Sequence, residues 1–291
     1  MNYDKLRFSI YGVLVVESDT LQDAVDYIQR ENQKEIRIGR KYTLDTVDFL
    51  RECPNITGVS FDIESPCDYS ALFEMPNLKD LSVSGTLDRK HYIPVNELEH
   101  LESLAISECG KENNIGKCKK LKKLHIYQYK PKPKNLEELR DLKTLEELCL
   151  NQGNLVELSG IETLNLKRLY LYYIRNLGDI SAVRGLGNTL TELEVEHCTK
   201  LTGYEALGAL KKVHWLKLVK CGDIPSLKFV SQMDGLKKIS FGQTNVIDGD
   251  ISPCERLDYA GFTNKKHFSH TFKQLNPDWD PCRKSEDSSE K

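Results

Sequence analysis

A short apolar pattern recurs along almost the whole chain of 291 residues. Each copy begins with an aliphatic residue at position n and carries aliphatic or aromatic residues at n+3 and n+5. Eight copies match strongly: LKDLSV (78–83), LESLAI (101–106), LKKLHI (121–126), LEELCL (145–150), LKRLYL (166–171), LTELEV (190–195), VHWLKL (213–218) and LKKISF (236–241). Such self-similarity predicts one structural unit built repeatedly, so the repeat determines the fold.

Weaker copies extend the pattern toward both ends. They are ITGVSF (56–61), a copy anchored at Gln33 with Ile36 and Ile38, a copy anchored at Ile10 with Val13 and Val15, and a copy anchored at Cys254 with Leu257 and Tyr259. About twelve copies result, and their anchors are 18 to 24 residues apart. Because n+3 and n+5 alternate with polar residues, each copy predicts a short β-strand with one buried face.

The repeat resembles that of leucine-rich repeat proteins, whose consensus is LxxLxLxx(N/C)xL. Position n+8 holds cysteine or threonine in five copies, as in the cysteine- or threonine-bearing members of that family: Cys109, Cys198, Cys221, Thr86 and Thr244. Tyr129, Gly153 and Ile174 depart from this pattern. The resemblance implies an α/β fold, a curved solenoid with a parallel β-sheet on the concave face and helices, 3₁₀ turns and loops on the convex face.

The pattern also divides the chain into segments. We expect a single solenoid over 1–275, with an N-terminal cap and first weak repeat in 1–32, repeats in 33–262 and a C-terminal cap in 263–275. Residues 276–291 are polar and rich in serine, which predicts a disordered tail. The outer returns are expected to be helical early in the chain, around 21–28 and 44–50, and irregular or 3₁₀ later, as in 178–188.

Composition narrows the cellular setting. No apolar run approaches the roughly 20 residues that span a bilayer, and polar residues follow Met1 where a signal peptide would be apolar. The nine cysteines are an odd number in a long chain, which favours reduced thiols. These features predict a cytoplasmic protein without a membrane partner.

The common signatures of catalysis are missing from the sequence. It contains no phosphate-binding glycine loop, no GxSxG, no HExxH and no CxxC. The His267-x-x-His270 pair is interpreted as a surface pair in preference to a metal site, and Cys198 and Cys221 as buried packing in preference to a redox pair. Cys149 lies on the exposed strand face. It is interpreted as a residue with a structural role or no specific role, and the alternative is a thiol that is chemically modified. We therefore expect no enzyme, no cofactor and no metal.

The exposed strand positions n+2, n+4 and n+6 form the surface that a partner would meet. In the N-terminal half they are small or mixed, as in Ser60, Ser82 and Ala105, and we expect little binding energy there. From residue 121 onward they become aromatic and charged, and we predict partner contacts at His125, Tyr127, Asn151, Arg168, Tyr170, Tyr172, Glu192, Glu194, Glu196, Trp215 and Lys217. Aromatic residues and arginine dominate interface hot spots. There are alternative explanations that involve no partner. Tyrosine is favoured in β-strands, and the glutamates can pair with charges on the neighbouring strand.

These observations predict a non-enzymatic module, monomeric when alone, that binds a protein partner on its concave face. Stand-alone proteins that resemble this one are encoded by bacteria, where they serve as adaptors or as immunity proteins that neutralise a toxin. One alternative is binding of nucleic acid or another acidic partner through the nine lysines between Lys111 and Lys134. Another is an enzyme or its specificity subunit, for which His125, Glu194, His197 and Cys149 are the candidate residues.

Overall fold

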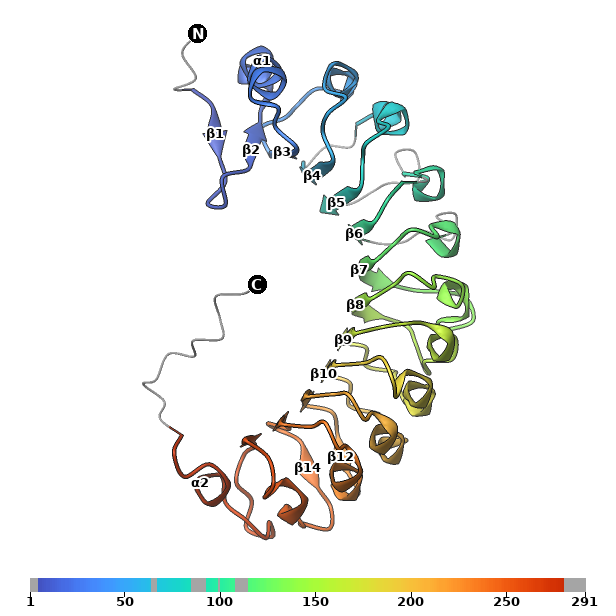
Figure 1. Ribbon diagram of the computed structural model, residues 1–291, viewed down its shortest axis with the longest axis vertical. Coiled ribbons are helices and arrows are strands. Elements are labelled where there is room, and N and C mark those ends of the chain that lie inside the picture. The colour runs from blue at the N-terminus through green and yellow to red at the C-terminus, as the bar shows by residue number, and fades with distance from the viewer. Residues whose placement is uncertain (1–4, 64–66, 85–92, 99, 108–114, 280–291) are drawn as a thin grey trace.

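The computed structural model describes residues 5–63, 67–84, 93–98, 100–107 and 115–279, and within them the chain winds into an arc with the strands on its inner side (Figure 1). One sheet contains β1 (Arg7–Phe8), β2 (Leu14–Val16), β3 (Glu35–Ile38), β4 (Gly58–Asp62), β5 (Asp80–Ser84), β6 (Ser103–Ser107), β7 (Lys123–Tyr129), β8 (Glu147–Gly153), β9 (Arg168–Tyr172), β10 (Glu192–Glu196), β11 (Trp215–Val219), β13 (Lys238–Ser240) and β15 (Tyr259–Gly261). Their spatial order is their order in the chain. A separate short pair is formed by β12 (Asp223–Ile224) and β14 (Asn245–Val246).

Equivalent repeat positions face each other across the sheet. Leu193 at n+3 of β10 pairs with Leu169 of β9 and Leu216 of β11, and all three side chains are buried. From β2 onward the neighbouring strands run parallel, while β1 pairs antiparallel with β2. The apolar positions therefore stack into one continuous core behind the sheet, which confirms the predicted solenoid.

The returns form the outer side of the arc. Helix α1 (Leu21–Glu31) buries Ala24, Val25 and Ile28, as the helical spacing predicts. A short α2 (Phe272–Leu275) follows the last strand. The others are 3₁₀ turns: η1 (Ser18–Thr20), η2 (Asp48–Glu52), η3 (Ser70–Glu74), η4 (Val95–Glu97), η5 (Ile115–Lys117), η6 (Glu137–Leu139), η7 (Ile161–Thr163), η8 (Ser181–Leu186), η9 (Tyr204–Ala209), η10 (Lys228–Gln232) and η11 (Ser252–Cys254). The helix expected around 44–50 is wrong, because Leu44 is exposed and the 3₁₀ turn begins only at Asp48.

The predicted register of the first copy is wrong by one residue. Leu14 and Val16 are buried opposite Ile36 and Ile38, whereas the expected anchor Ile10 is 92% exposed at the tip of the β1–β2 hairpin. Four apolar residues in a row, 13–16, offer an apolar side chain to either face of the strand. Pairing with β3, and not the sequence pattern, therefore decides the register.

The last copy is anchored at Leu257 and not at Cys254. Ala260 and Phe262 take the buried n+3 and n+5 positions, and Tyr259 lies on the inner face opposite Lys238. Alanine gives a weak apolar signal, which hid this copy in the sequence. The corrected anchor follows Leu236 by 21 residues instead of 18, within the spacing of the other repeats.

A buried ladder at n+8 closes the turns after β10, β11 and β13. Cys198, Cys221 and Thr244 are buried there, and Oγ1 of Thr244 donates to the Leu218 carbonyl oxygen at 2.7 Å and accepts from the Cys221 N–H at 3.1 Å. This confirms the packing interpretation of Cys198 and Cys221, while Cys109 and Thr86 lie outside the described residues.

The backbone at position n+7, just before the ladder, is left-handed in six consecutive repeats. The φ angles lie between 53° and 63° at Gln128, Gln152, Tyr173, His197, Lys220 and Gln243.

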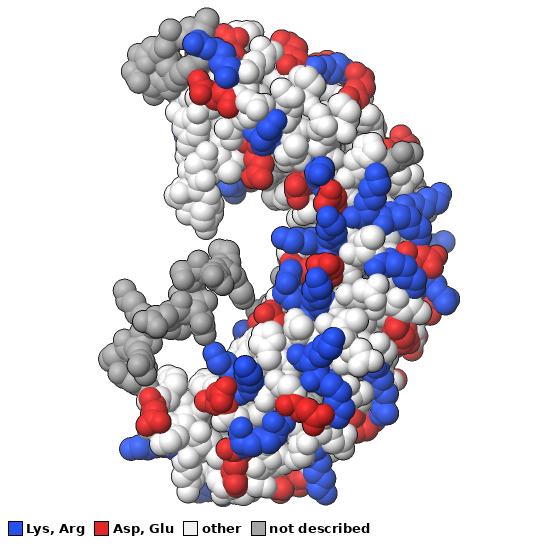
Figure 2. Space-filling model, viewed as in Figure 1, with Lys and Arg blue, Asp and Glu red and all other residues white. Residues whose placement is uncertain are grey.

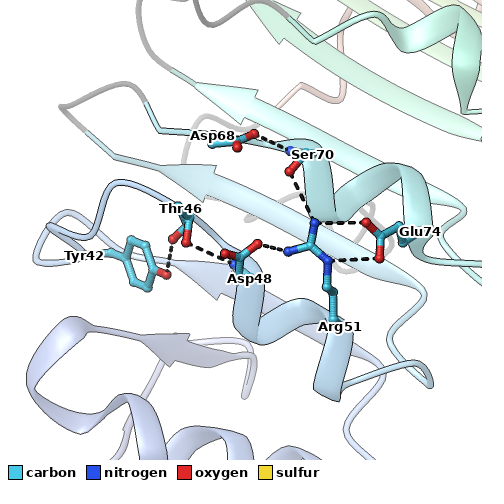
Figure 3. A network of polar contacts seen from close by, with 7 residues as sticks. All are labelled: Tyr42, Thr46, Asp48, Arg51, Asp68, Ser70 and Glu74. Atoms are coloured by element: carbon cyan, nitrogen blue, oxygen red, sulfur yellow. Dashed lines mark hydrogen bonds and ion pairs between the residues drawn. The ribbon is translucent and has the colours of Figure 1, made fainter.

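Polar contacts also join successive returns on the outer side. Arg51 of η2 donates from Nε and Nη2 to the two carboxylate oxygens of Glu74 in η3, both at 2.9 Å (Figure 3). The same guanidinium contacts Asp48 in its own turn and Ser70 in the next one. Two parallel hydrogen bonds between arginine and carboxylate fix the relative geometry of the two side chains, so this pair joins the two returns on the outer side.

The C-terminal edge of the sheet is capped by a side chain. Asn276 is only 7% exposed, and its amide accepts from the Ala260 N–H at 3.0 Å and donates to the Ala260 carbonyl at 2.8 Å. Trp279 packs edge-on against Phe272. The packed structure therefore extends to Trp279, four residues beyond the predicted end at 275, and 280–291 lie outside the described residues.

In the described part of the chain, no helix has the length and apolar character needed to cross a membrane.

Candidate functional site

All eleven residues predicted to contact a partner lie on the inner face of five neighbouring strands, β7 to β11. The strands are in register, so the side chains form three rows that run across the sheet. The n+2 row contains Arg168, Glu192 and Trp215; the n+4 row contains His125, Tyr170, Glu194 and Lys217; the n+6 row contains Tyr127, Asn151, Tyr172 and Glu196. The repeat thus brings together residues that are up to 92 positions apart in the chain.

Glu194 is the centre of one polar cluster. Its carboxylate is buried and accepts from the Tyr172 hydroxyl at 2.8 Å and from the Trp215 indole N–H at 3.0 Å. The ammonium group of Lys217 lies 3.8 Å away and makes a closer 2.5 Å contact with Glu196. A buried carboxylate is stable only when it is paired and hydrogen-bonded, and the neighbouring strands supply those partners.

Tyr170 and Glu192 continue this arrangement along the sheet. The Tyr170 hydroxyl donates to Oε2 of Glu192 at 2.8 Å, and its ring lies parallel to that of Tyr172 at 6.4 Å. Burial, followed by the hydrogen bond to Glu192, raises the pKa of Tyr170 above its usual value. The phenol therefore remains a hydrogen-bond donor throughout the neutral range, and the ring has a fixed position.

A second cluster surrounds Glu147, at n+2 of β8. Nε of Arg168 donates to its Oε2 at 2.6 Å, and Nε2 of His125 lies 2.5 Å from its Oε1. Burial alone would raise the pKa of Glu147, but the hydrogen bonds from Arg168 and His125 outweigh it, so the pKa is below its usual value. Glu147 is therefore ionised at neutral pH and holds the side chains of Arg168 and His125 in place.

A hollow of about 200 Å³ lies beside these clusters, on the inner face of β5 to β8. Small side chains of β5 and β6 line one part of it, and larger side chains of β7 and β8 line the rest. The lining includes Ser82, Ser84, Ala105, Ser107, Tyr127 and Asn151. Tyr127, 41% exposed, is the most exposed of the tyrosine and tryptophan residues among the predicted contacts.

Sequence reasoning missed this hollow and the role of Glu147. Ser82, Ser84 and Ala105 had been expected to contribute little because they are small. Small side chains next to Tyr127 are nevertheless what leaves the space open, and only the register of neighbouring strands reveals it. The available signal was a pair of consecutive copies, 78–83 and 101–106, with serine or alanine at both n+4 and n+6.

The surroundings of Cys149 do not favour catalysis by its thiol. Cys149 pairs in register with His125, but no hydrogen bond between the described side chains joins them. Burial, followed by the charges of Glu147 and Glu194, raises the pKa of Cys149 to about 11, so the thiol is protonated at neutral pH. A thiolate nucleophile needs the opposite environment.

The described residues contain no group of three or more side chains suited to holding a metal. His267 lies with Nε2 3.0 Å from the Val246 carbonyl, and Nε2 of His270 lies 3.1 Å from Glu255. The two imidazoles thus have separate protein partners, which agrees with the interpretation of a surface pair.

The lysine-rich segment 111–134 is distributed over several parts of the repeat. Lys122 is 2.6 Å from Glu102, Lys119 is 3.8 Å from Asp141, and Lys120 is 3.0 Å from Nδ1 of His100, while Lys123 lies on the inner face. Lys111 lies outside the described residues. Figure 2 shows basic and acidic side chains interspersed on the visible face, which is not the continuous positive stripe typical of nucleic-acid binding.

No protein-family model matches the chain, and no curated protein matches its sequence. Solved structures match in fold. An internalin, inlF, from Listeria monocytogenes gives a TM-score of 0.54 at 15% sequence identity, over 88% of this chain and 82% of that one. A leucine-rich repeat protein from Leptospira interrogans gives 0.47 at 16% identity, over 81% and 74%. With the in-register parallel strands described above, the likeness to inlF establishes that the chain folds as a leucine-rich repeat protein.

Proposed function

We propose that this chain is a non-enzymatic binding module that holds a protein partner on the inner face of β5 to β11. The observation that supports this most directly is the array of Tyr170, Tyr172 and Trp215 beside Arg168 on adjacent strands. Aromatic residues and arginine bury large areas at low entropic cost and are enriched in interface hot spots. The half-exposed Tyr127 and the neighbouring hollow extend the same surface.

The internal pairing of these side chains also favours binding. Tyr172 and Trp215 are held by Glu194, and Arg168 is held by Glu147, before any partner arrives. Side chains that are already ordered lose little conformational entropy on association. The partner would therefore meet a rigid template with little rearrangement of this chain.

Two biological roles are consistent with this proposal. As an adaptor, the chain would link a partner to a third component; as an immunity protein, it would cover a toxin and abolish its activity. Both rest on analogy between proteins of the same fold. Assay of the captured partner distinguishes them, because only the immunity role predicts that stoichiometric binding inhibits a toxic activity.

The proposal is tested by affinity capture from a nuclease-treated lysate of the source cells, with mass spectrometry of the bound proteins. Three forms are compared: wild type, Tyr127→Ala on the inner face, and Phe73→Ala on the outer return η3, whose ring is exposed to a similar degree. We expect one dominant protein that Tyr127→Ala loses and Phe73→Ala keeps. Capture that is lost only with Phe73→Ala, or that depends on nucleic acid, would overturn the proposal.

A further inference from the structure

The hollow on β5 to β8 has the size and surface of a receptor for one aromatic ring. A cavity of roughly 150 Å³ is enough to hold benzene, and this hollow measures about 200 Å³. Ala105 and Tyr127 both line it. An aromatic side chain inserted there would lie beside the Tyr127 ring, and contacts between aromatic rings add to the gain from buried area.

Two polar side chains that line the hollow already have hydrogen-bond partners. The Ser84 hydroxyl donates to the Phe61 carbonyl at 3.1 Å, and His125 is joined to Glu147. An inserted ring would therefore displace water without breaking these hydrogen bonds. The lining residues that the structure describes include no aspartate, glutamate, lysine or arginine, so the hollow fits an apolar ring better than an ion.

Strand β10, four strands from β6, carries an excess of negative charge. Its inner face has three carboxylates, Glu192, Glu194 and Glu196, and Lys217 is the only lysine or arginine that pairs with any of them in the described structure. Glu192 accepts from the Tyr170 hydroxyl, lies 3.7 Å from Nε2 of His214 and faces Arg168 in register, whose charge it feels without an ion-pair contact. Its side chain is 26% exposed, so a cation from outside can reach it.

We propose that the partner presents an extended segment with an aromatic residue for the hollow and a lysine or arginine for Glu192. This inference rests on the proposed function and specifies its partner. Strands in a sheet are about 4.8 Å apart, so four spacings place the two subsites about 19 Å apart. An extended chain rises about 3.3 Å per residue, so the two partner residues would be about six positions apart.

The test is a displayed library of random peptides, each about twelve residues long to span both subsites, selected on the immobilised full chain. We expect enriched sequences that combine an aromatic residue with a lysine or arginine five to seven positions away, roughly the spacing derived above. The best peptide is then titrated against wild type, Ala105→Trp, Glu192→Gln, Tyr127→Ala and the outer-face control Phe73→Ala. Urea unfolding verifies that each variant is folded, and Ala105→Leu replaces Ala105→Trp if the larger side chain prevents folding.

Filling the hollow and neutralising Glu192 should each weaken binding roughly tenfold, and Glu192→Gln should also reduce its salt dependence. Glu192→Lys should restore binding to a peptide in which the basic residue is replaced by glutamate. Binding that falls with Tyr127→Ala but is unaffected by Ala105→Trp and Glu192→Gln would overturn this inference and leave inner-face binding intact. Binding lost only with Phe73→Ala would overturn both proposals, and a library without binders would overturn the inference.

Discussion

The indole N–H of Trp215 donates to Oε1 of Glu194 at 3.0 Å, across the boundary between β11 and β10. From the opposite side, the Tyr172 hydroxyl donates to the other oxygen of the same buried carboxylate. These two aromatic residues therefore connect neighbouring strands through Glu194 and also belong to the candidate binding face. Replacing them affects the stability of the protein and not only its surface.

We predict that the double variant Tyr172→Ala/Trp215→Ala lowers the free energy of unfolding by about 2 to 4 kcal/mol, because Glu194 loses two hydrogen-bond donors and the packing of both rings is lost. Urea unfolding measures the change. The matched control is Tyr127→Ala, whose half-exposed side chain should contribute within about 0.5 kcal/mol. Equal stability of the double variant and wild type would show that Glu194 does not depend on these donors.

The n+8 ladder predicts a second stability effect. Thr244→Val removes a hydroxyl that bonds both the Leu218 carbonyl and the Cys221 N–H. Leaving these backbone groups unpaired should cost about 2 kcal/mol in the free energy of unfolding. Thr244→Cys should cost less, since cysteine occupies this position at Cys198 and Cys221. A valine variant as stable as the cysteine variant would contradict the account.

The edge cap gives a third prediction. Asn276→Ala removes both hydrogen bonds to Ala260 and exposes the backbone of β15. We expect a loss of about 1 to 3 kcal/mol in stability, together with more self-association, because open strand edges pair with other chains. Urea unfolding and light scattering measure the two effects. Unchanged values in both would mean that Asn276 does not cap the sheet.

The pKa of Glu147 predicts how stability depends on pH. Because this pKa is lower in the folded state, the contribution of Glu147 is present above the usual glutamate pKa of about 4.3 and is lost as pH falls through the folded value. Arg168→Met removes the hydrogen bond from Arg168, which is one cause of the lowered pKa of Glu147. The variant should therefore lose less stability than wild type between about pH 6 and pH 3, as measured by urea unfolding at each pH. Identical losses would exclude this pairing as a source of acid sensitivity.

The environment of Cys149 predicts low reactivity. With a pKa of about 11, its thiolate fraction at pH 8 is roughly a hundredfold lower than that of a free cysteine. Alkylation by iodoacetamide, followed peptide by peptide with mass spectrometry, should proceed correspondingly more slowly than in an unstructured cysteine peptide. Alkylation at the rate of the peptide would show that the thiol is more accessible or more acidic than the structure indicates.

The fold was predictable because apolar residues recur at the same positions of each copy, and burying them together fixes the register of neighbouring strands. The predicted register was wrong only in the first and last copies, where this recurrence is weak. Residues 13–16 are apolar on both strand faces, and the last copy has alanine at Ala260, so local pattern alone could not place either strand.

The inner-face position of the eleven candidate residues followed from the period of two along each strand. Their pairing did not, because it depends on which way each long side chain leans across the sheet. Tyr170 reaches Glu192 on the next strand, and Glu147 is held from both sides by Arg168 and His125. The hollow was invisible for a related reason, since empty volume is a property of neighbouring strands and not of one segment.

The most direct test of the central claim replaces one residue at a time by the photo-crosslinking amino acid benzoylphenylalanine. Position 127 samples the inner face and position 73 the outer face, and both rings are partly exposed in the structure. After irradiation in source-cell lysate, we expect position 127 to capture a single protein that position 73 does not. Capture of that protein from position 73 alone would contradict binding on the inner face.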